Sequence, residues 1–512
     1  MGSKSSKKQK NDDLKKIGEE ANKNEPSTFC TFTPINVTNE LLVAQSKSNP
    51  DADYKKLNFL GEGSFASVYR VQNRYTDAIC AMKIINKNYS CSVSDEKEIL
   101  NEILNEINIL RTMDHPGILK IFEFYSNQQS YSIVTELCPG GELFQQIIDK
   151  GPFTEKYSAY VMYQIFSAVN YCHKMHIVHR DLKPENILIV NKDKDGFPTI
   201  KICDFGTSKI FEKGAVQRKL VGSSYYIAPE VLKKHYNEKC DIWSCGVILY
   251  ILLSARPPFG GQDDNDIMER VATGVYDLES PPFDKVSASA LDLIRKLLTM
   301  DVNERITAEQ ALNHPWFKEN KSQEYYNKIK DNDTMKELIE NLKKYKRTSI
   351  IQETALAYLV HHFPQVKDVI NSCKLFNQMD KSGDGKITKA ELLKGLSERY
   401  KSKTLEQDVE EIYKNLDMDN NGYIGYEEFV RAAVSKEYFV KDNVLRFAFR
   451  YFDKDDSGEI TFDEIENLFT QSIPDKTKVH ETLKNIIQEV DKNNDDKITF
   501  EEFSIVMKKM IK

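Results

Sequence analysis

The feature that most constrains the fold is a repeat in the last third of the chain. Four acidic segments of twelve residues follow one another at nearly even intervals: Asp380 to Glu391, Asp417 to Glu428, Asp453 to Glu464 and Asp491 to Glu502. Each has an isoleucine at its eighth position and is flanked on both sides by apolar residues at helical spacing. Accidental acidic turns would not share this pattern, so the region is predicted to contain two pairs of helix–loop–helix units.

Oxygen-bearing residues stand at alternate positions of each segment, which is the donor arrangement that Ca2+ prefers, and a terminal glutamate can bind with both oxygens. The segments resemble EF-hand loops, which have glycine at the sixth position for a sharp turn and pair through a short strand at the eighth. That strand would contain Ile387, Ile424, Ile460 and Ile498. The resemblance implies these calcium ligands, with backbone carbonyls at the seventh positions: Asp380, Ser382, Asp384, Lys386, Glu391; Asp417, Asp419, Asn421, Tyr423, Glu428; Asp453, Asp455, Ser457, Glu459, Glu464; Asp491, Asn493, Asp495, Lys497, Glu502.

The four loops are not equivalent. The first has Ser382 at its third position and therefore carries fewer charges, and the fourth has Asp496 where the sharp turn favours glycine. Because aspartate adopts a left-handed backbone only at some cost, we expect the fourth loop to bind Ca2+ more weakly. A structural or magnesium-filled role for one loop is the alternative.

A second concentration of chemistry lies between residues 179 and 206. The segment His179-Arg180-Asp181-Leu182-Lys183-Pro184-Glu185-Asn186 precedes Asp204-Phe205-Gly206. Two carboxylates, an amide and a lysine are what phosphoryl transfer needs to orient a hydroxyl, hold Mg2+ and place a cation near the phosphoryl group. Strand-like runs at 187–190 and 199–202 flank a segment rich in Asp, Gly and Pro, so a hairpin would bring Asn186 beside Asp204.

Both segments resemble the catalytic and metal-binding loops of eukaryotic protein kinases. The resemblance implies that Asp181 is the catalytic base, that Lys183 contacts phosphate, and that Asn186 and Asp204 bind Mg2+. Lys183 also suggests serine/threonine specificity. The alternative is that both linked motifs occur by chance in an ordinary loop.

The kinase resemblance extends to the nucleotide site. A glycine-rich turn, Leu60 to Tyr69, would cover the phosphates, and it departs from the family pattern at Ala66, where a third glycine is expected. A helix over 96–113 would place Glu106 as the ion-pair partner of Lys83, rather than as an ordinary solvent-facing glutamate. A strand over 131–137 leads into the expected hinge. The predicted nucleotide-binding residues are Leu60, Gly61, Glu62, Gly63, Val68, Ala81, Lys83, Glu106, Glu136, Cys138, Glu142 and Leu188. Glu142 and Glu185 are also candidates for receiving a basic substrate residue, with surface solvation as the alternative.

The segment that precedes Ala228-Pro229-Glu230 lacks an acceptor where one is expected. Residues 212–222 contain no Ser, Thr or Tyr, so phosphorylation cannot supply a charge for Arg180 at the usual position. Glu212 is a candidate fixed charge for Arg180, and control is expected to lie outside this segment. The resemblance further implies an ion pair between Glu230 and Arg305 and a bracing role for Asp241.

A connection of 318–371 separates the two regions. Met335, Leu338, Ile339 and Leu342 form an apolar stripe that is followed by basic residues, and a helical run covers 351–360. A basic amphipathic helix is a frequent target of EF-hand grooves, so we expect an autoinhibitory and sensor-binding junction. A rigid linker with a solvated lysine face is the alternative.

Residues 1–53 lack a sustained apolar period and are predicted to be a disordered tail. The beginning, Met1-Gly2-Ser3-Lys4-Ser5-Ser6, fits an N-myristoylation pattern and is followed by lysines that would attract anionic lipid. A solvated lysine-rich tail is the alternative. The nine cysteines show no CxxC spacing, which favours a reducing compartment, and no run approaches a membrane span. The mild net charge of -7 gives no support to nucleic-acid binding.

The order of these parts resembles the calcium-dependent protein kinases of plants and protists. It implies a multidomain α+β chain: a tail at 1–53, a bilobal kinase domain at 54–317, a junction at 318–371 and an all-α domain with four EF-hands at 372–512. The expected protein is a monomeric, cytoplasmic Ser/Thr kinase that uses ATP, Mg2+ and Ca2+, is inhibited by its junction without Ca2+, and associates with membrane through Gly2 if acylated. A calcium-sensing pseudokinase scaffold and activation by a separate calmodulin are the alternatives.

Overall fold

The computed structural model describes residues 39–46, 49–62, 66–87, 93–192, 196–210, 217, 222–320, 332–346, 348–398, 404–417, 421–470, 480, 483–484, 487–488 and 490–511. The predictions that concern Gly2, Gly63, Glu212 and Asp419 lie outside these residues. Within the described part, no helix combines the length and the apolar character that crossing a membrane requires.

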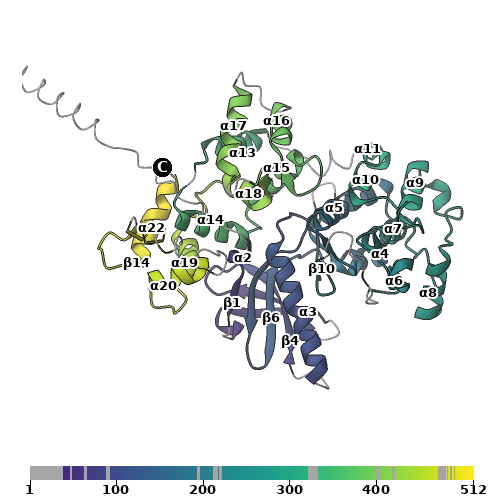
Figure 1. Ribbon diagram of the computed structural model, residues 1–512, viewed down its shortest axis with the longest axis horizontal. Helices are drawn as coiled ribbons and strands as arrows, with labels where there is room; N and C mark the ends of the chain where they lie inside the picture. Colours follow the sequence, from purple (N-terminus) through teal and green to yellow (C-terminus); the bar gives the residue numbers. More distant parts are fainter. Residues whose placement is uncertain are drawn as a thin grey trace, which may run out of the picture. The chain divides into compact units, whose positions relative to one another are not determined.

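A twisted six-stranded sheet forms the first lobe, in the order β1-β5-β6-β4-β3-β2 (Figure 1). Its strands are β1 (Ala44–Ser46), β2 (Tyr54–Glu62), β3 (Ala66–Asn73), β4 (Ile79–Asn86), β5 (Ile121–Ser126) and β6 (Ser130–Glu136). Alternate residues of β4 are buried, with Cys80, Met82 and Ile84 packed on one face of the sheet. The opposite side-chain direction of Lys83 follows from the two-residue period of a strand.

The N-terminal segment requires one correction. Residues 39–46 and 49–53 are ordered, so the prediction that the disordered tail extends to residue 53 is wrong for them. The short helix α2 (Asn39–Leu42) buries Leu41 and Leu42 and contacts α3 (Val93–Thr112), while β1 pairs in parallel with β5. Elements of three or four residues are stabilised by tertiary contacts rather than by a local period, which is why the sequence pattern did not indicate them.

The second lobe is mostly helical. Its helices are α4 (Leu143–Lys150), α5 (Glu155–Lys174), α6 (Pro229–Leu232), α7 (Lys239–Ser254), α8 (Asp264–Thr273), α9 (Ala288–Leu297), α10 (Ala308–Leu312) and α11 (Pro315–Glu319). Short 3-10 turns cover Pro50–Ala52, Pro184–Asn186, Phe283–Lys285 and, at the far end of the chain, Lys509–Ile511. Thr154 begins α5 by accepting a hydrogen bond from the backbone of Tyr157, and α7 is buried from Cys240 to its end at Ser254.

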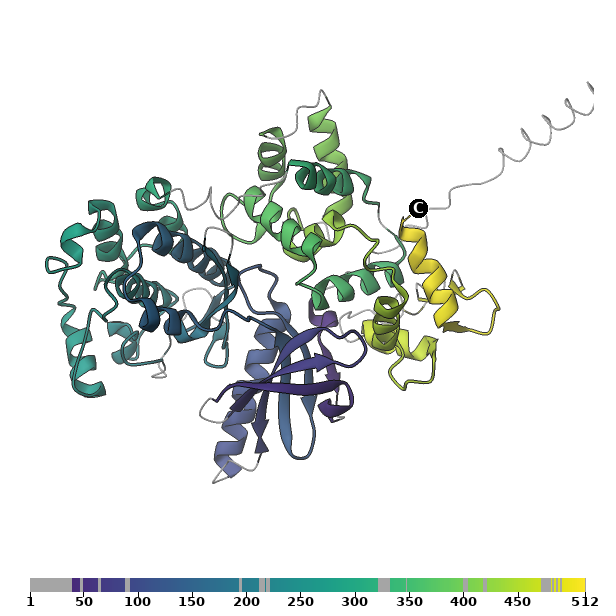
Figure 2. The same cartoon turned by 180° about the vertical axis from the view of Figure 1, so that it is seen from behind.

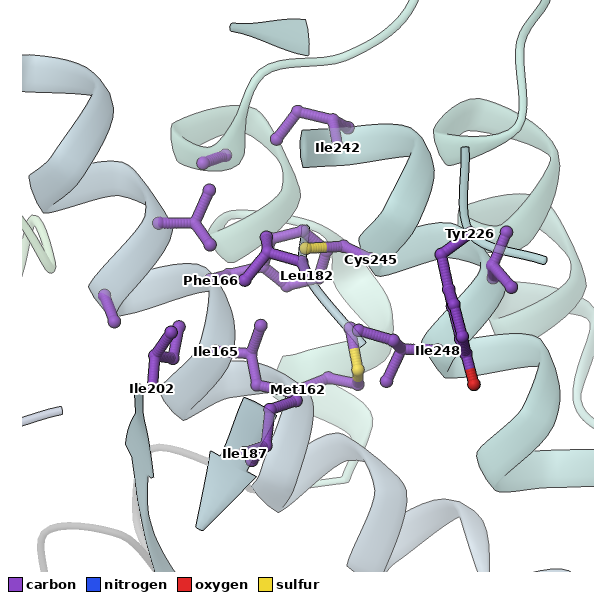
Figure 3. Close-up of a cluster of buried hydrophobic side chains, with 14 of the residues drawn as sticks. Met162, Ile165, Phe166, Leu182, Ile187, Ile202, Tyr226, Ile242, Cys245 and Ile248 are labelled. Atoms are coloured by element: carbon purple, nitrogen blue, oxygen red, sulfur yellow. The ribbon is translucent and has the colours of Figure 1, made fainter. Parts of the chain in front are cut away.

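The core of this lobe lies directly under the predicted catalytic loop. Figure 3 shows Leu182 of that loop among Phe166 from α5 and Cys245 and Ile248 from α7. Leu182 is fully buried and therefore fixes the loop between the two helices. The polar residues on either side of Leu182 are therefore carried by a rigidly held backbone.

The predicted hairpin is present. Strands β8 (Ile187–Lys192) and β9 (Pro198–Ile202) pair in antiparallel fashion, with Ile187 opposite Ile202. The backbone nitrogen of Cys203 donates to the carbonyl of Asn186 at 3.0 Å. This bond continues the ladder to the two predicted metal ligands. A second small pair joins β7 (Ile177–Val178) to β10 (Lys209–Ile210).

The junction contains α13 (Asn332–Lys344) and α14 (Ile350–His362), in agreement with the two predicted helical runs. The EF-hand region follows with α15 (Lys367–Met379), α16 (Lys389–Ser397), α17 (Leu405–Leu416), α18 (Tyr426–Ala433), α19 (Asp442–Phe452), α20 (Phe462–Thr470) and α22 (Phe500–Lys508). In both views of the ribbon α14 lies beside α18 and α19, and the contacts between these helices agree (Figures 1 and 2).

Short strands join the loops in pairs, as the isoleucines predicted. Strand β11 (Lys386–Ile387) pairs with β12 (Ile424–Gly425), which places Ile387 opposite Ile424. Strand β13 (Glu459–Thr461) pairs with β14 (Lys497–Thr499), which places Ile460 opposite Ile498. The structure therefore contains two EF-hand pairs.

Candidate functional site

Asp181 is held by hydrogen bonds from three residues. Its Oδ2 accepts from Lys183 Nζ at 2.7 Å and from Asn186 Nδ2 at 3.3 Å, and its Oδ1 accepts from the Oγ and backbone nitrogen of Ser223 at 2.9 and 3.0 Å. Burial alone would raise the pKa of Asp181, but the bonds from Lys183 and Ser223 lower it below its ordinary value. The carboxylate is therefore ionised and oriented at neutral pH.

The Asn186 side chain binds Asp181 through its amide nitrogen, which places its amide oxygen on the opposite side. Its Nδ2 also donates to the backbone carbonyl of Asp181 at 2.8 Å, so the amide oxygen is directed away from that residue. The hairpin ladder brings Asp204 to the same end of the strands, where its side chain is about half exposed. Two oxygen donors at the mouth of a site suit Mg2+, which keeps several of its own waters.

Lys83 and Glu106 form the predicted ion pair. Lys83 Nζ lies 3.1 Å from Glu106 Oε2 and 4.0 Å from Asp204 Oδ1. Burial would lower the pKa of Lys83, but the two carboxylates outweigh it and raise the pKa above the ordinary value. A charged ammonium thus lies between Glu106 on α3 and the predicted metal ligand Asp204, and its contact with nucleotide phosphates stays a prediction.

The segment after Asp204 is packed inward. Phe205 is fully buried and its ring meets the His179 ring edge to face, with centroids 4.7 Å apart. Asp241 braces the preceding loop by accepting from the backbone nitrogens of His179 and Arg180 at 2.9 and 2.8 Å. Asp204 itself has φ of 64°, a left-handed conformation for a non-glycine residue. Such a backbone persists only where its surroundings fix it.

The expected hinge is joined to the second lobe by backbone bonds. Gly140 donates to the carbonyl of Ile189 at 2.8 Å, and Ile189 donates to Gly141 at 2.8 Å. A Cβ at Gly140 would lie 2.5 Å from the Ile189 side chain, so only glycine allows this approach. Leu188, beside this contact, forms a bridge with Glu142, and Val68, Ala81 and Cys138 are half-buried like it.

Not every predicted nucleotide-site residue is equally enclosed. Leu60 and Glu62 are exposed on β2, and Gly61 is half-buried. The Glu136 carboxylate does not face a bound nucleotide, because it pairs with Lys201 Nζ at 2.8 Å and accepts a hydrogen bond from the backbone nitrogen of Lys120 at 2.8 Å. The Glu136 backbone nitrogen also donates to the carbonyl of Lys120 at 3.1 Å, so its backbone carbonyl is the group placed for the predicted nucleotide contact.

The expected bracing pair between Glu230 and Arg305 is present. Arg305 donates to both oxygens of Glu230, at 2.5 and 3.0 Å, and both side chains are buried. The Arg305 guanidinium also lies 5.0 Å from the centre of the Trp243 ring. The pair fixes α6 to α7 and to the loop after α9.

In all four predicted calcium loops, the backbone nitrogen of the sixth residue donates to the aspartate at the first position. In the third loop, Asp453 accepts from the backbone nitrogens of Ser457 and Gly458, each at 2.9 Å. Carboxylate oxygens of Asp453, Asp455 and Glu464 all lie within 4.8 Å of one another. Burial, opposed by the backbone bonds and assisted by the Glu464 charge, raises the pKa of Asp453. Three converging carboxylates in a loop of this shape fit a hard divalent cation.

The fourth loop adopts the strained backbone that its sequence predicted. Asp496 has φ of 60°, whereas Gly458 occupies the equivalent position of the third loop with φ of 87°. The Asp496 nitrogen still donates to Asp491 Oδ2 at 2.8 Å, as the glycine does in the third loop. The loop is thus formed with aspartate at its turn, and weaker binding remains a prediction.

Models of two protein families match this chain. The Protein kinase domain model matches residues 54–317, and the EF-hand domain pair model matches residues 371–434 and 442–508. Calcium-dependent protein kinase 4 of Plasmodium berghei (strain Anka) is 38% identical over 467 residues, which is 89% of this chain and 86% of that protein. Calcium-dependent protein kinase 19 of Oryza sativa subsp. japonica is 35% identical over 489 residues, which is 95% and 88% of the two chains. The chain belongs to the calcium-dependent protein kinase family.

The family resemblance inferred from the motifs is therefore confirmed. The apolar stripe of α13 is buried, with Met335 at 8% exposure and Leu342 at 0%. Its main contacts are with α15, α17 and α18 of the first EF-hand pair. Lys343 Nζ pairs with Asp408 Oδ2 at 2.9 Å at the edge of the stripe. The EF-hand helices thus enclose the junction helix in this structure.

The first EF-hand loop contacts the kinase domain directly. Asn170 Nδ2 of α5 donates to the carbonyl of Gly383 at 3.2 Å, and Lys174 Nζ lies 3.0 Å from Asp384 Oδ2. A Cβ at Gly385 would lie 2.6 Å from the Tyr171 ring. The loop therefore packs on α5 with its backbone close to the helix.

A buried polar cluster joins the second EF-hand to the sheet lobe. Glu427 pairs with Lys120, and its Oε1 lies 3.2 Å from His361 Nδ1. His361 Nε2 lies 2.8 Å from the carbonyl of Ile121 in β5, and Asp114 accepts from the Glu427 nitrogen at 3.0 Å. Burial opposes the ionised form of Glu427, but Lys120 and His361 hold its pKa below the ordinary value.

Several functional contacts were not predicted from the sequence. Ser223 orients Asp181, Asn105 contacts the segment after Asp204, and Lys174 and His361 join the kinase to the EF-hands. The serine stands beside a recognisable motif and could have been considered. The other three sit in ordinary helical positions, where nothing in the local pattern distinguishes them from solvated residues.

Proposed function

We propose that this protein is a calcium-activated serine/threonine kinase in which the EF-hand domain controls the kinase domain through the junction. The kinase and EF-hand families of its two parts imply ATP with Mg2+ and Ca2+ as its cofactors. The observation that carries the proposal is the joint presence of a complete Lys83–Glu106 pair and a junction helix enclosed by EF-hand helices. The pseudokinase alternative has no support, because every residue that it would lack is present.

The catalytic roles follow from the contacts. Asp181 accepts the proton of the substrate hydroxyl and orients it, because its carboxylate is ionised and fixed by Lys183 and Ser223. Lys183 and Lys83 supply positive charge on either side of the transferred phosphoryl group. Asn186 and Asp204 would hold Mg2+, which neutralises charge on the phosphate oxygens.

The regulatory step concerns the junction. Without Ca2+, the apolar stripe of α13 is released from the EF-hands and lies against the kinase domain, where it inhibits the enzyme. With Ca2+ bound, the EF-hand helices capture the stripe and leave the cleft clear. The absence of Ser, Thr and Tyr from residues 212–222 supports control of this kind, since phosphorylation there has no acceptor.

A preference for a basic residue in the substrate follows from Glu142 and Glu185. Burial raises the pKa of Glu185, and the charges of Glu142 and Asp181 add to that effect. Within the described residues Glu185 Oε2 is buried without a hydrogen-bond partner. A guanidinium or ammonium group would satisfy that oxygen and offset the repulsion.

The domain limits and the tail complete the proposal. We assign the kinase domain to 54–317, the junction to 318–371 and the EF-hand domain to 372–512. Acylation of Gly2, with the lysines that follow it, would give reversible membrane association, because one acyl chain alone binds weakly. The kinase would act as a monomer.

The experiment is phosphate transfer from labelled ATP to two serine peptides in saturating Ca2+. The peptides are identical except that basic residues upstream of the serine are replaced by alanine in one. Transfer to the basic peptide, its loss in Asp204→Ala and a reduced preference in Glu185→Gln would support the proposal. Transfer that persists in Asp204→Ala would assign the activity to a contaminant.

A further inference from the structure

Asn105 connects the helix that carries Glu106 to the segment that follows Asp204. It precedes Glu106 in α3, and its Nδ2 lies 2.8 Å from the carbonyl oxygen of Ser208, 3.3 Å from that of Gly206 and 3.5 Å from that of Phe205. A side-chain amide has two hydrogens, so the three carbonyls share them and Ser208 receives the shortest bond. Because Asn105 and Glu106 are neighbours on one helix, displacing α3 would disturb both contacts.

The Ser208 carbonyl is also part of a bridge to the catalytic loop. Arg180 Nη2 lies 3.4 Å from the same oxygen, and the hydroxyls of Thr207 and Ser208 donate to the carbonyl of His179 at 3.1 and 3.2 Å. Asp241 in turn fixes the backbone of His179 and Arg180. A continuous set of hydrogen bonds therefore runs from α3 through residues 205–208 to the loop that holds Asp181.

The bridge consists of hydrogen bonds from the side chains of Asn105, Arg180, Thr207 and Ser208 to backbone carbonyls. Kinases regulated by activation-segment phosphorylation use the new charge to engage the arginine before the catalytic aspartate. Residues 212–222 of this chain offer no acceptor, and among the described residues the Arg180 guanidinium donates to the Tyr236 hydroxyl and the Ser208 carbonyl. The neutral amide of Asn105 reaches the oxygen that Arg180 also reaches.

We propose that Asn105 is a positioning residue that couples the placement of α3 to the magnesium-binding conformation of Asp204, in place of a phosphorylated activation segment. It touches neither substrate nor reacting atoms and acts through residues 205–208, which follow the left-handed backbone of Asp204. The inference rests on the proposed kinase function and deepens its regulation. Loss of the amide donors would free these carbonyls and leave Asp204 to sample other conformations.

The test compares two variants of nearly the same size in the full-length chain. Asn105→Leu removes both donors, and Asn105→Asp replaces them with an oxygen that repels the carbonyls. Asn101→Leu is the matched control, because Asn101 is exposed on the same helix one turn earlier. For each variant, kcat/KM is measured in saturating Ca2+ as a function of Mg2+ concentration. The dissociation constant of an ATP analogue is measured with and without Mg2+, and the ratio of the two values is compared.

The proposal predicts that both variants lose about tenfold in kcat/KM and require about tenfold more Mg2+ for half-saturation. It also predicts that Mg2+ tightens the binding of the ATP analogue less in these variants than in the wild type. The control Asn101→Leu should behave like the wild type in both readouts, and the thermal unfolding midpoints of the variants should be unchanged. If Asn105→Leu does not fold, Asn105→Asp decides the matter by the same readouts.

Two results would overturn the proposal. One is a pair of variants within about twofold of wild type in both readouts. The other is a fall in kcat/KM with unchanged Mg2+ dependence and analogue binding, which would mark Asn105 as merely structural. An inactive wild type would instead contradict the proposed kinase function, so the two failures are distinguishable.

Discussion

Lys174 Nζ in α5 of the kinase domain lies 3.0 Å from Oδ2 of Asp384, which stands at the fifth position of the first calcium loop. The contact supplies a positive charge to a loop whose first residue, Asp380, has its pKa raised to about 7 by burial and by the Asp384 charge. If Asp384 binds Ca2+ as predicted, Lys174 and the cation compete for one carboxylate, and calcium occupancy of this loop is linked to its docking on α5.

Replacing that lysine should strengthen calcium binding to the first loop. In Lys174→Met, Asp384 loses its counter-charge and becomes a better ligand, so we expect affinity to rise by about two- to fivefold, the scale of a partly exposed ion pair. Isothermal titration calorimetry of the full chain would measure it. Lys318→Met, an exposed lysine of α11, is the control. A lower affinity in Lys174→Met would contradict the competition.

Neutralising Glu106 should impair catalysis without unfolding the enzyme. Glu106→Gln weakens the 3.1 Å pair with Lys83, and we expect kcat/KM to fall by about 10- to 100-fold, because an ion pair is replaced by a bond from the charged lysine to a neutral amide. Steady-state kinetics on a serine peptide provide the measurement, and the exposed Glu102→Gln on the same helix is the control. Equal effects of the two substitutions would refute a specific role for the pair.

A polar residue in the junction stripe should raise the calcium requirement. Leu342 is completely buried where α13 meets the EF-hand helices, so Leu342→Asp places an unpaired charge in that contact and weakens capture. We expect the half-activating Ca2+ concentration to increase by about tenfold or more. Glu337→Gln changes an exposed position of the same helix and should leave the calcium curve unmoved. A wild-type calcium curve in Leu342→Asp would argue against capture.

His115 should make folding stability depend on pH. Burial and the Lys201 charge lower its pKa to about 3, and its Nδ1 accepts from the Gly117 nitrogen at 2.9 Å, which requires an unprotonated nitrogen. The unfolded chain binds a proton near the ordinary histidine pKa of about 6.5, whereas the folded chain does not. The contribution of His115 to the free energy of unfolding is therefore complete above about pH 6.5. It falls as the pH decreases toward 3, by at most about 1.4 kcal/mol per pH unit.

The comparison that isolates this residue is His115→Gln. The difference in unfolding free energy between wild type and variant, from urea titrations at several pH values in saturating Ca2+, should shrink on acidification. Parallel pH profiles for the two proteins would show that His115 does not carry the effect.

The sequence predicted local chemistry well and long-range contacts poorly. The hairpin that brings Asn186 to Asp204 and the strand contacts of the four isoleucines depend on nearby residues, so periodicity and turn composition indicated them. The ordering of residues 39–46 depends on α3 and β5, which lie far along the chain. The contact of Asn105 with Ser208 spans 103 residues and the contact of Lys174 with Asp384 spans 210, and neither leaves a local signature.

The most direct test of the account is phosphorylation of a basic serine peptide by the full-length protein across a titration of free Ca2+. The account predicts negligible transfer in chelator and a cooperative rise as the EF-hands fill, with the rise moved to higher Ca2+ by Glu464→Gln in the third loop. Transfer that is the same in chelator and in saturating Ca2+ would contradict it.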